Sequence, residues 1–434
     1  MRRLMTVLLV LPMCVVFAWA QAPDDALKDR VNQLVERLDS PKNDVRDTAE
    51  KTLIGLGSKV LPLLPDLTKT TSKERKERIE RIRTALAEAE QNANLGASRV
   101  TIQAKGIRLS EAIRQLQAKT GNAITDLREQ FGTEVTNPSL ELDIADKPFF
   151  EALDIIAKKA DLVPSFFTSD GTIGLMAVPM MREGEDKPAE NPFLIYSGPF
   201  RVVFKQIFVS RDLQADTGTA NAQFEVAWEP RLRPMLLALK VDEIKIVDDQ
   251  GKEVKPAVMQ ESTELPLRPE NPAAEVNLNM TSPERAARKL ASIRVKAEVT
   301  VPAALRTFRF SSLAAKNVIA KQGDITVTLE DTEIDEQVWK VHVTVLYPGG
   351  EGPAFESYRQ GLFNNRLWLE KADGSRFEHN GGFSPTGSDA GKLSFEYLFV
   401  EAPGKPSDYR FVYETPSKVL TIPLDFEFKD VPLP

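Results

Sequence analysis

An internal repeat is the feature of this sequence that most restricts its fold. Residues 100–124 (VTIQAKGIRLSEAIRQLQAKTGNAI) return forty positions later as residues 140–164 (LELDIADKPFFEALDIIAKKADLVP). In each copy, apolar residues first alternate with polar ones and then recur at helical spacing, which predicts a strand followed by a helix. Two such units in succession predict a small α/β domain.

The helical halves of the two copies match most closely. Each carries apolar residues at positions i, i+3, i+4 and i+7, the spacing of a helix face that packs on a sheet; the matched sets are Leu109, Ala112, Ile113, Leu116 and Phe149, Ala152, Leu153, Ile156. Ser110 and Pro148 are suited to the two helix starts. Glu111 and Glu151 recur in the first turn, where the helix dipole favours an acid. Further strands are expected at 123–127 and 165–177.

The resulting β-α-β-β-α-β order over residues 98–180 resembles the secretin and TonB short N-terminal (STN) domain. The resemblance rests on the strand, the Glu-Ala-Ile/Leu helix and their repetition. It implies a module that binds extracytoplasmic partners or assembles into rings through sheet edges and helix faces. No pore region or outer-membrane barrel pattern follows, so the sequence does not support a channel.

The first twenty residues have the composition of a secretory signal peptide. Arg2 and Arg3 precede an apolar stretch that ends in Ala18-Trp19-Ala20, a small-x-small cleavage pattern. Removal of residues 1–20 would place the protein outside the cytoplasm, periplasmic or secreted, and would leave no transmembrane helix. The alternative is an uncleaved anchor, because about 17 apolar residues reach the lower limit for spanning a bilayer.

Charge and cysteine content narrow the classes of partner. The only cysteine, Cys14, lies in the signal, so the exported chain would have no disulfide. The formal net charge is −7 and is spread along the chain. Nucleic-acid binding is not expected, because that affinity depends on Lys and Arg that neutralise phosphates.

Residues 23–95 are predicted to form a helical arm. Apolar residues fall at helical spacing in this segment, and DVRDTAEKTLIGLG (44–57) closes at a glycine that is suited to a helix C-terminus. This segment resembles the second helix of a HEAT repeat. Since stacked repeats usually need three or more units to bury a continuous core, a docking arm or cap is expected rather than a free solenoid.

After a charged linker at 181–194 the pattern changes to period 2, which predicts antiparallel sheets. Strands are expected at 200–209, 222–229, 237–247, 274–280, 292–300, 323–330, 337–347, 366–370, 393–400, 409–413 and 419–428. EIKIVDDQGKEV (243–254) resembles RLWLEKADGSRF (366–377), so two tandem immunoglobulin-like sandwiches are expected, at 195–312 and 313–434. Two segments of the second, AFESYRQGLFNNRLWLEKADG (354–374) and VYETPSKVLTIPLDFEFKDVPLP (412–434), resemble the end domain of a large family of exported bacterial multidomain proteins, which implies architecture and no active site.

Candidate chemical groups are few. The chain has two histidines: His342 falls on the more polar face of its strand, and His379 falls in a glycine-rich turn. Asp331, Glu333 and Asp335 alternate in a predicted loop and are either a calcium site or a solvated hairpin tip. Trp228 and Trp368 are either ligand contacts that stack on sugar rings or core residues.

The fold class predicted from the sequence is therefore multidomain α+β: helical hairpins, a small β-α-β-β-α-β domain and two β-sandwiches. We expect a non-enzymatic extracytoplasmic scaffold that binds a protein or another cell-envelope component, without a catalytic residue or a cofactor. Oligomers through the STN-like domain are a further expectation. The alternative is a carbohydrate- or peptidoglycan-binding protein, or a hydrolase, that uses the surface of a β-sandwich.

Overall fold

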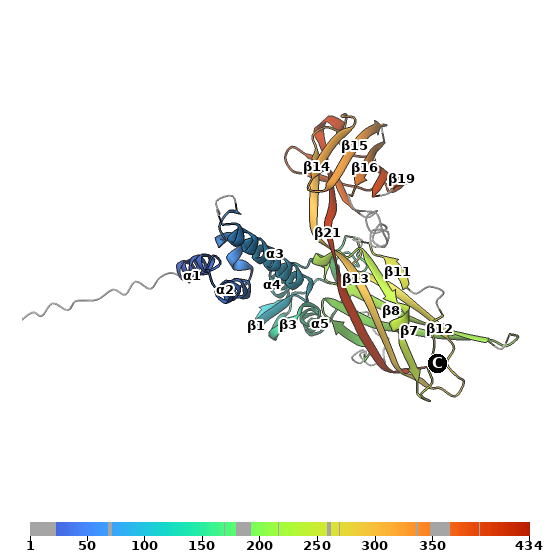
Figure 1. Cartoon of the computed structure of the whole chain (residues 1–434). Coiled ribbons are helices and arrows are strands. Elements are labelled where there is room, and N and C mark those ends of the chain that lie inside the picture. Colours follow the sequence, from blue (N-terminus) through green and yellow to red (C-terminus); the bar gives the residue numbers. More distant parts are fainter. Residues whose placement is uncertain are drawn as a thin grey trace, which may run out of the picture. The chain divides into compact units, whose positions relative to one another are not determined.

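The computed structural model describes residues 23–67, 72–168, 170–178, 192–215, 217–257, 262–268, 270–335, 337–347, 365–389 and 391–434. The expected signal peptide (1–20) and most of the expected linker (181–194) lie outside these residues. The chain forms two compact units, Met1–Asn94 and Leu95–Pro434 (Figure 1). Helices occur in the first half and several antiparallel sheets in the second, so the chain is a multidomain α+β protein, the coarse class that the sequence predicts.

The first unit is helical. It contains α1 (Pro23–Arg37), α2 (Asn43–Gly55), the 3-10 turn η1 (Ser58–Leu63) and α3 (Lys73–Leu95), whose last residue opens the second unit. Each element contributes apolar side chains to one core, among them Val31, Leu38, Leu53, Val60, Ile79 and Ile82, all fully buried. The amphipathic spacing of the sequence therefore corresponds to real packing faces.

A buried arginine ties α3 to α2. The Arg78 side chain lies 2.9 Å from Asp47, 2.6 Å from Glu50 and 2.7 Å from Glu74. Burial opposes the charge of Arg78, but these three carboxylates outweigh it and raise its pKa. The start of α3 (KERKERIERIR, 73–83) is rich in Lys and Arg, and Arg78 in this run belongs to an internal ion-pair network.

The repeat folds as β1 (Arg99–Arg108), α4 (Leu109–Thr120) and β2 (Ile124–Asp126), followed by β3 (Ser139–Pro148), α5 (Phe149–Lys159), β4 (Leu162–Ser165) and β5 (Ile173–Ala177). The matching strands β1 and β3 pair with each other antiparallel, with Ile102 opposite Ile144 and Ala104 opposite Leu142. In a second sheet β5 pairs parallel with β2 and antiparallel with β4. The apolar faces of α4 and α5 share one core with both sheets.

The start of α4 differs from the expectation. Ser110 does not precede the helix; its backbone N–H instead donates to the side-chain oxygen of Asn137 at 3.0 Å, and the N–H of Leu109 donates to Pro138 O. The loop before β3 therefore caps the first helix. At the other end, Gly121 takes the left-handed conformation (φ 72°) that glycine adopts without steric cost.

The rest of the second unit contains three sheets. One has the order β12-β8-β7-β6, and another has the order β14-β15-β16-β20-β19. The third has the order β11-β9-β13-β21-β17-β18, with β10 also paired to β13. The strands are β6 (Leu194–Ser197), β7 (Phe200–Asp212), β8 (Thr217–Trp228), β9 (Leu236–Lys240), β10 (Lys245–Asp248), β11 (Ser262–Pro266), β12 (Ala273–Thr281), β13 (Lys289–Phe310), β14 (Val318–Gln322), β15 (Ile325–Ile334), β16 (Val338–Leu346), β17 (Arg366–Lys371), β18 (Arg376–Glu378), β19 (Phe383–Asp389), β20 (Lys392–Val400) and β21 (Tyr409–Pro432).

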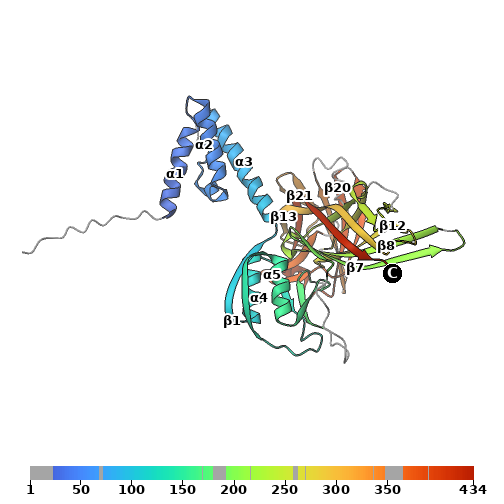
Figure 2. The same ribbon diagram turned by 90° about the horizontal axis from the view of Figure 1, so that it is seen from below.

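Two long strands join the two hydrophobic cores of this β region. β13 and β21 pair antiparallel from Lys289 opposite Pro432 to Phe310 opposite Phe411, and both views show them side by side (Figures 1 and 2). One end of this ribbon belongs to the core around Phe224, and the other end to the core around Phe395. The expected domains 195–312 and 313–434 therefore share a strand pair, and the end of the chain completes the first core.

Candidate functional site

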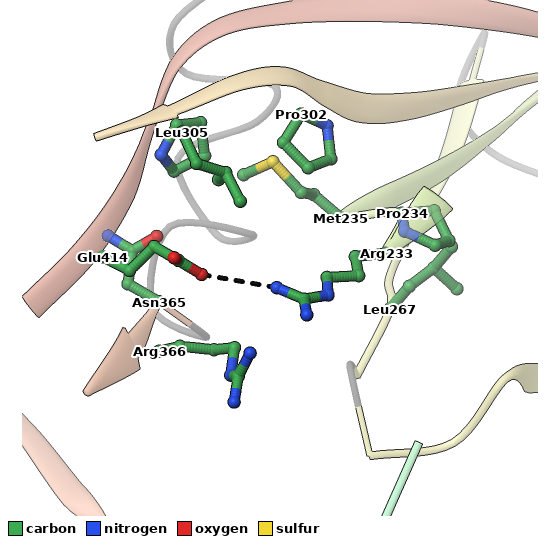
Figure 3. Close-up of a pocket in the computed structure, with 10 residues that line it drawn as sticks. Arg233, Pro234, Met235, Leu267, Pro302, Leu305, Asn365, Arg366 and Glu414 are labelled. Carbon is green, nitrogen blue, oxygen red and sulfur yellow. Dashed lines mark hydrogen bonds and ion pairs between the residues drawn. The ribbon is translucent and has the colours of Figure 1, made fainter. Parts of the chain in front are cut away.

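A cavity of about 50 Å³ lies where β13 and β21 pass from one core to the other (Figure 3). Its polar lining residues are Arg233, Asn365, Arg366 and Glu414, and its apolar ones are Pro234, Met235, Leu267, Pro302, Leu305 and Pro416. The pairing of β13 with β21 shifts register on both sides of Ala304. Proline lacks an amide hydrogen, so Pro302 and Pro416 cannot donate to the ladder in this irregular stretch.

Arg233 reaches the cavity from a special backbone position. It follows a 3-10 turn (Pro230–Leu232) and adopts φ 47° and ψ 57°, the left-handed region. Residues other than glycine enter that region at a cost of roughly 1–2 kcal/mol. The next residues are held in place, because Met235 N–H donates to Thr300 O at 2.8 Å and Met235 O accepts from Leu267 N–H.

Two arginines and one glutamate line this cavity. Arg233 Nη1 donates to Glu414 Oε1 at 3.3 Å, and Arg366 lies 4.0 Å from Glu378 outside the cavity. Burial, and then the positive charge of Arg366, lower the pKa of Arg233, whereas Glu414 acts in the opposite direction. In Figure 3, Arg233 and Glu414 reach toward each other and Arg366 lies next to them.

Asn365 connects the cavity to a buried group of hydroxyls. Its side-chain nitrogen lies 2.9 Å from Tyr413 Oη and 2.8 Å from Thr415 Oγ1, and Thr415 is also hydrogen-bonded to Tyr347. Burial raises the pKa of Tyr413 well above its usual value, so this phenol stays protonated. The hydroxyls of Tyr347, Tyr413 and Thr415 thus hold Asn365 and the start of β17 in place.

The three candidate calcium ligands are distributed along a strand and its end. Asp331 and Glu333 lie in β15 rather than in a loop, while Asp335 follows the strand, where its N–H donates to Val338 O. Asp331 contacts His342, and Glu333 lies 3.4 Å from Lys340. Within the described part of the chain, no three His, Cys, Asp or Glu residues are grouped so that they could hold a metal ion.

His342 lies between two carboxylates from neighbouring strands. Its Nδ1 is 2.7 Å from Asp331 Oδ1, and its Nε2 is 3.1 Å from Glu396 Oε2. The strand register explains this arrangement, because His342 on β16 stands opposite Asp331 on β15 and Glu396 on β20. Burial disfavours the imidazolium, but the two acceptors outweigh it and raise the pKa of His342.

Trp228 and Trp368 are buried, at 3% and 2% exposure, so neither presents a free ring face. Trp228 packs in the first core, whereas Arg366 and Arg376 cover the ring of Trp368, with Arg376 at 4.4 Å from its centroid. His379 lies in its turn, where its Nε2 is 2.8 Å from Gly382 O. The structure brings none of these three residues into the cavity of Arg233.

Glu229, like the cavity of Arg233, was not predicted from the sequence. It is fully buried, and its carboxylate accepts hydrogen bonds from Ser98 N–H at 2.8 Å, Asn122 Nδ2 at 2.9 Å and Arg231 Nε at 2.6 Å. The Ser98 hydroxyl also contacts it. These contacts join the α/β module (98–178) to the end of β8. No local motif marks Glu229, because two of these three partners, Ser98 and Asn122, come from a distant part of the chain.

The comparisons with known proteins do not assign the chain to a family. No protein-family model and no curated protein matches it. A solved structure entitled "The crystal structure of the conserved domain protein from Bacillus anthracis" aligns with 56% of this chain and 90% of its own, at 8% identity and a TM-score of 0.18. A likeness at that TM-score supports no argument about fold or function.

Proposed function

We propose that this protein is a non-enzymatic scaffold that presents a rigid surface to a protein partner outside the cytoplasm. The observation that carries the proposal is the fixed attachment of the α/β module to the β region. A module that is anchored at several points presents its faces and those of the sheet in a constant arrangement. That arrangement reduces the entropy lost on binding a partner.

Two polar junctions and a shared core make this attachment. Glu229 holds Ser98 and Asn122 of the module at one junction. At the other, Asp154 of α5 accepts hydrogen bonds from Tyr196 at 2.6 Å and Arg201 at 2.9 Å. Between them the core of the module includes Ala227 and Ala273 of the sheet, so the module and the sheet also share buried apolar contacts.

The β7–β8 hairpin supplies a surface for a partner. β6 and Phe193 cover the edge of β7 only from Phe200 to Phe204, so residues 206–212 form an open strand edge in the described sheet. Phe208 is 56% exposed and Leu213, in the adjoining turn, is 83% exposed. Open edges and neighbouring exposed apolar side chains are features that β-strand addition uses.

The proposal also includes the identities of the individual domains and the export of the protein. Two observations support an STN-like module, namely the order β1-α4-β2-β3-α5-β4 and the pairing of the repeated strands. The helical first unit is compatible with a HEAT-like docking arm, and the stacked sheets with immunoglobulin-like sandwiches. The composition of residues 1–20 supports export. Among the described helices, none is long and apolar enough to cross a membrane.

Site-specific crosslinking tests the function. A photoreactive amino acid at Leu213, introduced into the full chain in its native host, should form one discrete adduct with a protein. The same group at Ile319, a 68% exposed position on β14, is the matched control and should not form it. The purified partner should then lose at least about tenfold in affinity for Phe208→Ser/Leu213→Ser, since exposed apolar anchors dominate many interfaces.

Two outcomes would contradict the scaffold function. Equal adducts at both positions would mean that Leu213 marks no specific surface. Tight binding of purified peptidoglycan that the double variant retains, together with the absence of a protein adduct, would favour a carbohydrate-binding protein instead.

A further inference from the structure

We propose that the cavity between Arg233 and Arg366 is a binding site for a carboxylate group attached to a short aliphatic chain. The site is independent of the hairpin surface, because its residues come from the segment before β9, from the bend of the β13–β21 ribbon and from the start of β17. Its charge, its unused hydrogen-bond donors, its backbone and its walls each point to this ligand.

The charge of the cavity is positive. Arg233 and Arg366 contribute two positive charges, and Glu414 is the only carboxylate among the described lining residues. The two guanidinium groups are near enough that the charge of Arg366 acts on Arg233. A monoanion placed between them would relieve this repulsion and neutralise the site.

The donors that such an anion needs are present and largely unused. Within the described residues, the guanidinium of Arg233 hydrogen-bonds to Glu414 alone, through Nη1. Arg366 lies over the ring of Trp368, 5.7 Å from its centroid, and approaches Glu378 no closer than 4.0 Å. An arginine guanidinium carries five N–H donors in a planar fork that fits a carboxylate, so both residues retain donors for a ligand.

The backbone at Arg233 supports a function for this residue. Its left-handed conformation is costly for an arginine, and Pro234 follows directly. Strained positions persist where the surrounding structure fixes them, and they are concentrated at binding and active sites. Here the hydrogen bonds of Met235 hold the segment, and the side chain of Arg233 extends into the cavity (Figure 3).

The walls and size of the cavity select the class of anion. Met235, Leu267 and Leu305 are apolar and suit an aliphatic chain next to the charged group. A volume of about 50 Å³ suits a group of a few heavy atoms.

The carboxylate has two sources with the same chemistry. It is either a free short-chain acid or the carboxyl end of a polypeptide, and the second source rests on the proposed function. Butyrate is the probe for the first source. Acetyl-Ala-Val with a free carboxyl end is the probe for the second, and its amide is the control.

The experiment measures binding to the full-length exported protein by calorimetry and ligand-observed NMR. Butyrate should bind saturably, whereas butyramide, which has the same shape without the charge, should not. Arg366→Gln and Arg233→Gln should each weaken butyrate binding at least about tenfold, because a charge-assisted hydrogen bond is lost. Arg366→Lys, which keeps the charge but not the fork, should have an intermediate effect.

Arg285→Gln is the matched control, since Arg285 is exposed and lies outside the cavity. Thermal melting of each variant shows that it is folded before its affinity is compared. Equal binding of butyrate and butyramide, equal loss in Arg285→Gln, or no saturable binding of either acid would overturn the proposal.

Binding of the peptide acid but not its amide assigns the site to a polypeptide end, and binding of butyrate alone assigns it to a free acid. Neither result depends on the crosslink at Leu213. The carboxylate site can therefore be disproved without disproving the scaffold function, and the reverse also holds.

Discussion

The ring of Phe428, near the end of the chain, packs edge-on against the ring of Phe204 with 5.5 Å between their centroids. Phe224 lies between the two in sequence and contacts both, at 5.0 Å from Phe204 and 5.8 Å from Phe428. The last strand therefore completes a core that begins more than two hundred residues earlier in the chain. The first β core cannot be assembled from a continuous segment.

Phe428→Ala should strongly destabilise the second unit. Removal of a buried phenylalanine leaves a cavity and typically costs about 3–5 kcal/mol. Chemical denaturation of the purified protein measures this loss. Phe208→Ala is the matched control: Phe208 is exposed on β7, so the change should cost no more than about 0.5 kcal/mol. Equal effects of the two substitutions would mean that the aromatic cluster is not a core.

A fragment of residues 195–312 should not fold by itself. It lacks Leu424, Phe426 and Phe428, which fill the first core from β21. Addition of residues 409–434 through a flexible linker should restore cooperative thermal melting, because the β13–β21 pairing is then available. Circular dichroism distinguishes the outcomes, and a cooperative transition of the shorter fragment would disprove the shared core.

Glu229→Ala should destabilise the attachment of the α/β module. The substitution leaves Arg231, Asn122 and the N–H of Ser98 without their acceptor in a buried site. Removal of one partner from a buried charged pair costs about 3–5 kcal/mol. Glu253→Ala, at an exposed position, is the control. Hydrogen exchange should accelerate in β1 and α4 of Glu229→Ala only; unchanged exchange there would mean that Glu229 does not hold the module.

The sequence predicts the local elements of this fold and not their long-range arrangement. Leu109, Ala112 and Leu116 were expected on a helix face and are buried, as are Phe149 and Ile156. Periodicity reports which face of an element meets a core. It does not report which strand is its neighbour, and the return of β21 to the first core depends on pairing between distant segments.

The candidate site was beyond sequence reasoning for a related reason. Arg233, Arg366 and Glu414 belong to separate segments, and each is an ordinary charged residue in its local context. Glu229 is buried although isolated acids are usually exposed, because Ser98 and Asn122 of the α/β module donate hydrogen bonds to it together with the nearby Arg231. Asp331 and Glu333 were expected in a loop between the strands at 323–330 and 337–347, but the pairing of β15 with β16 extends over both residues.

Trp368→Phe should leave the stability of the protein unchanged or raise it by up to about 1 kcal/mol. Trp368 Nε1 is buried and has no hydrogen-bond partner in the described structure, and an unsatisfied buried donor is unfavourable. Phenylalanine keeps an aromatic face for Arg376 without that donor. Urea denaturation measures the change, with Trp228→Phe, in the packed first core, as the contrasting variant that should lose stability. A large loss in Trp368→Phe would reveal a role for the indole nitrogen.

The two histidines should give opposite pH dependences of stability. The folded-state pKa of His342 is raised, because its hydrogen bonds to Asp331 and Glu396 outweigh burial, so its stabilising effect is present below the unfolded pKa of about 6.5. This effect is lost as the pH rises through the folded pKa. Burial lowers the pKa of His379, so its protonation opposes folding, and stability falls as the pH drops below the unfolded value.

His342→Gln should therefore cost about 1–2 kcal/mol near pH 5.5, where the imidazolium would bridge both carboxylates, and less near pH 8.5. His379→Gln should remove the loss of stability that the wild type shows at low pH. The variant should therefore be most stable relative to the wild type near pH 5.5. The free energy of unfolding in urea, measured at both pH values, checks each variant. Because the chain has two histidines, the double variant isolates their contribution and should lose both histidine-dependent trends. A loss in His342→Gln that is the same at both pH values would mean that His342 stabilises the sheet through packing rather than through its charge.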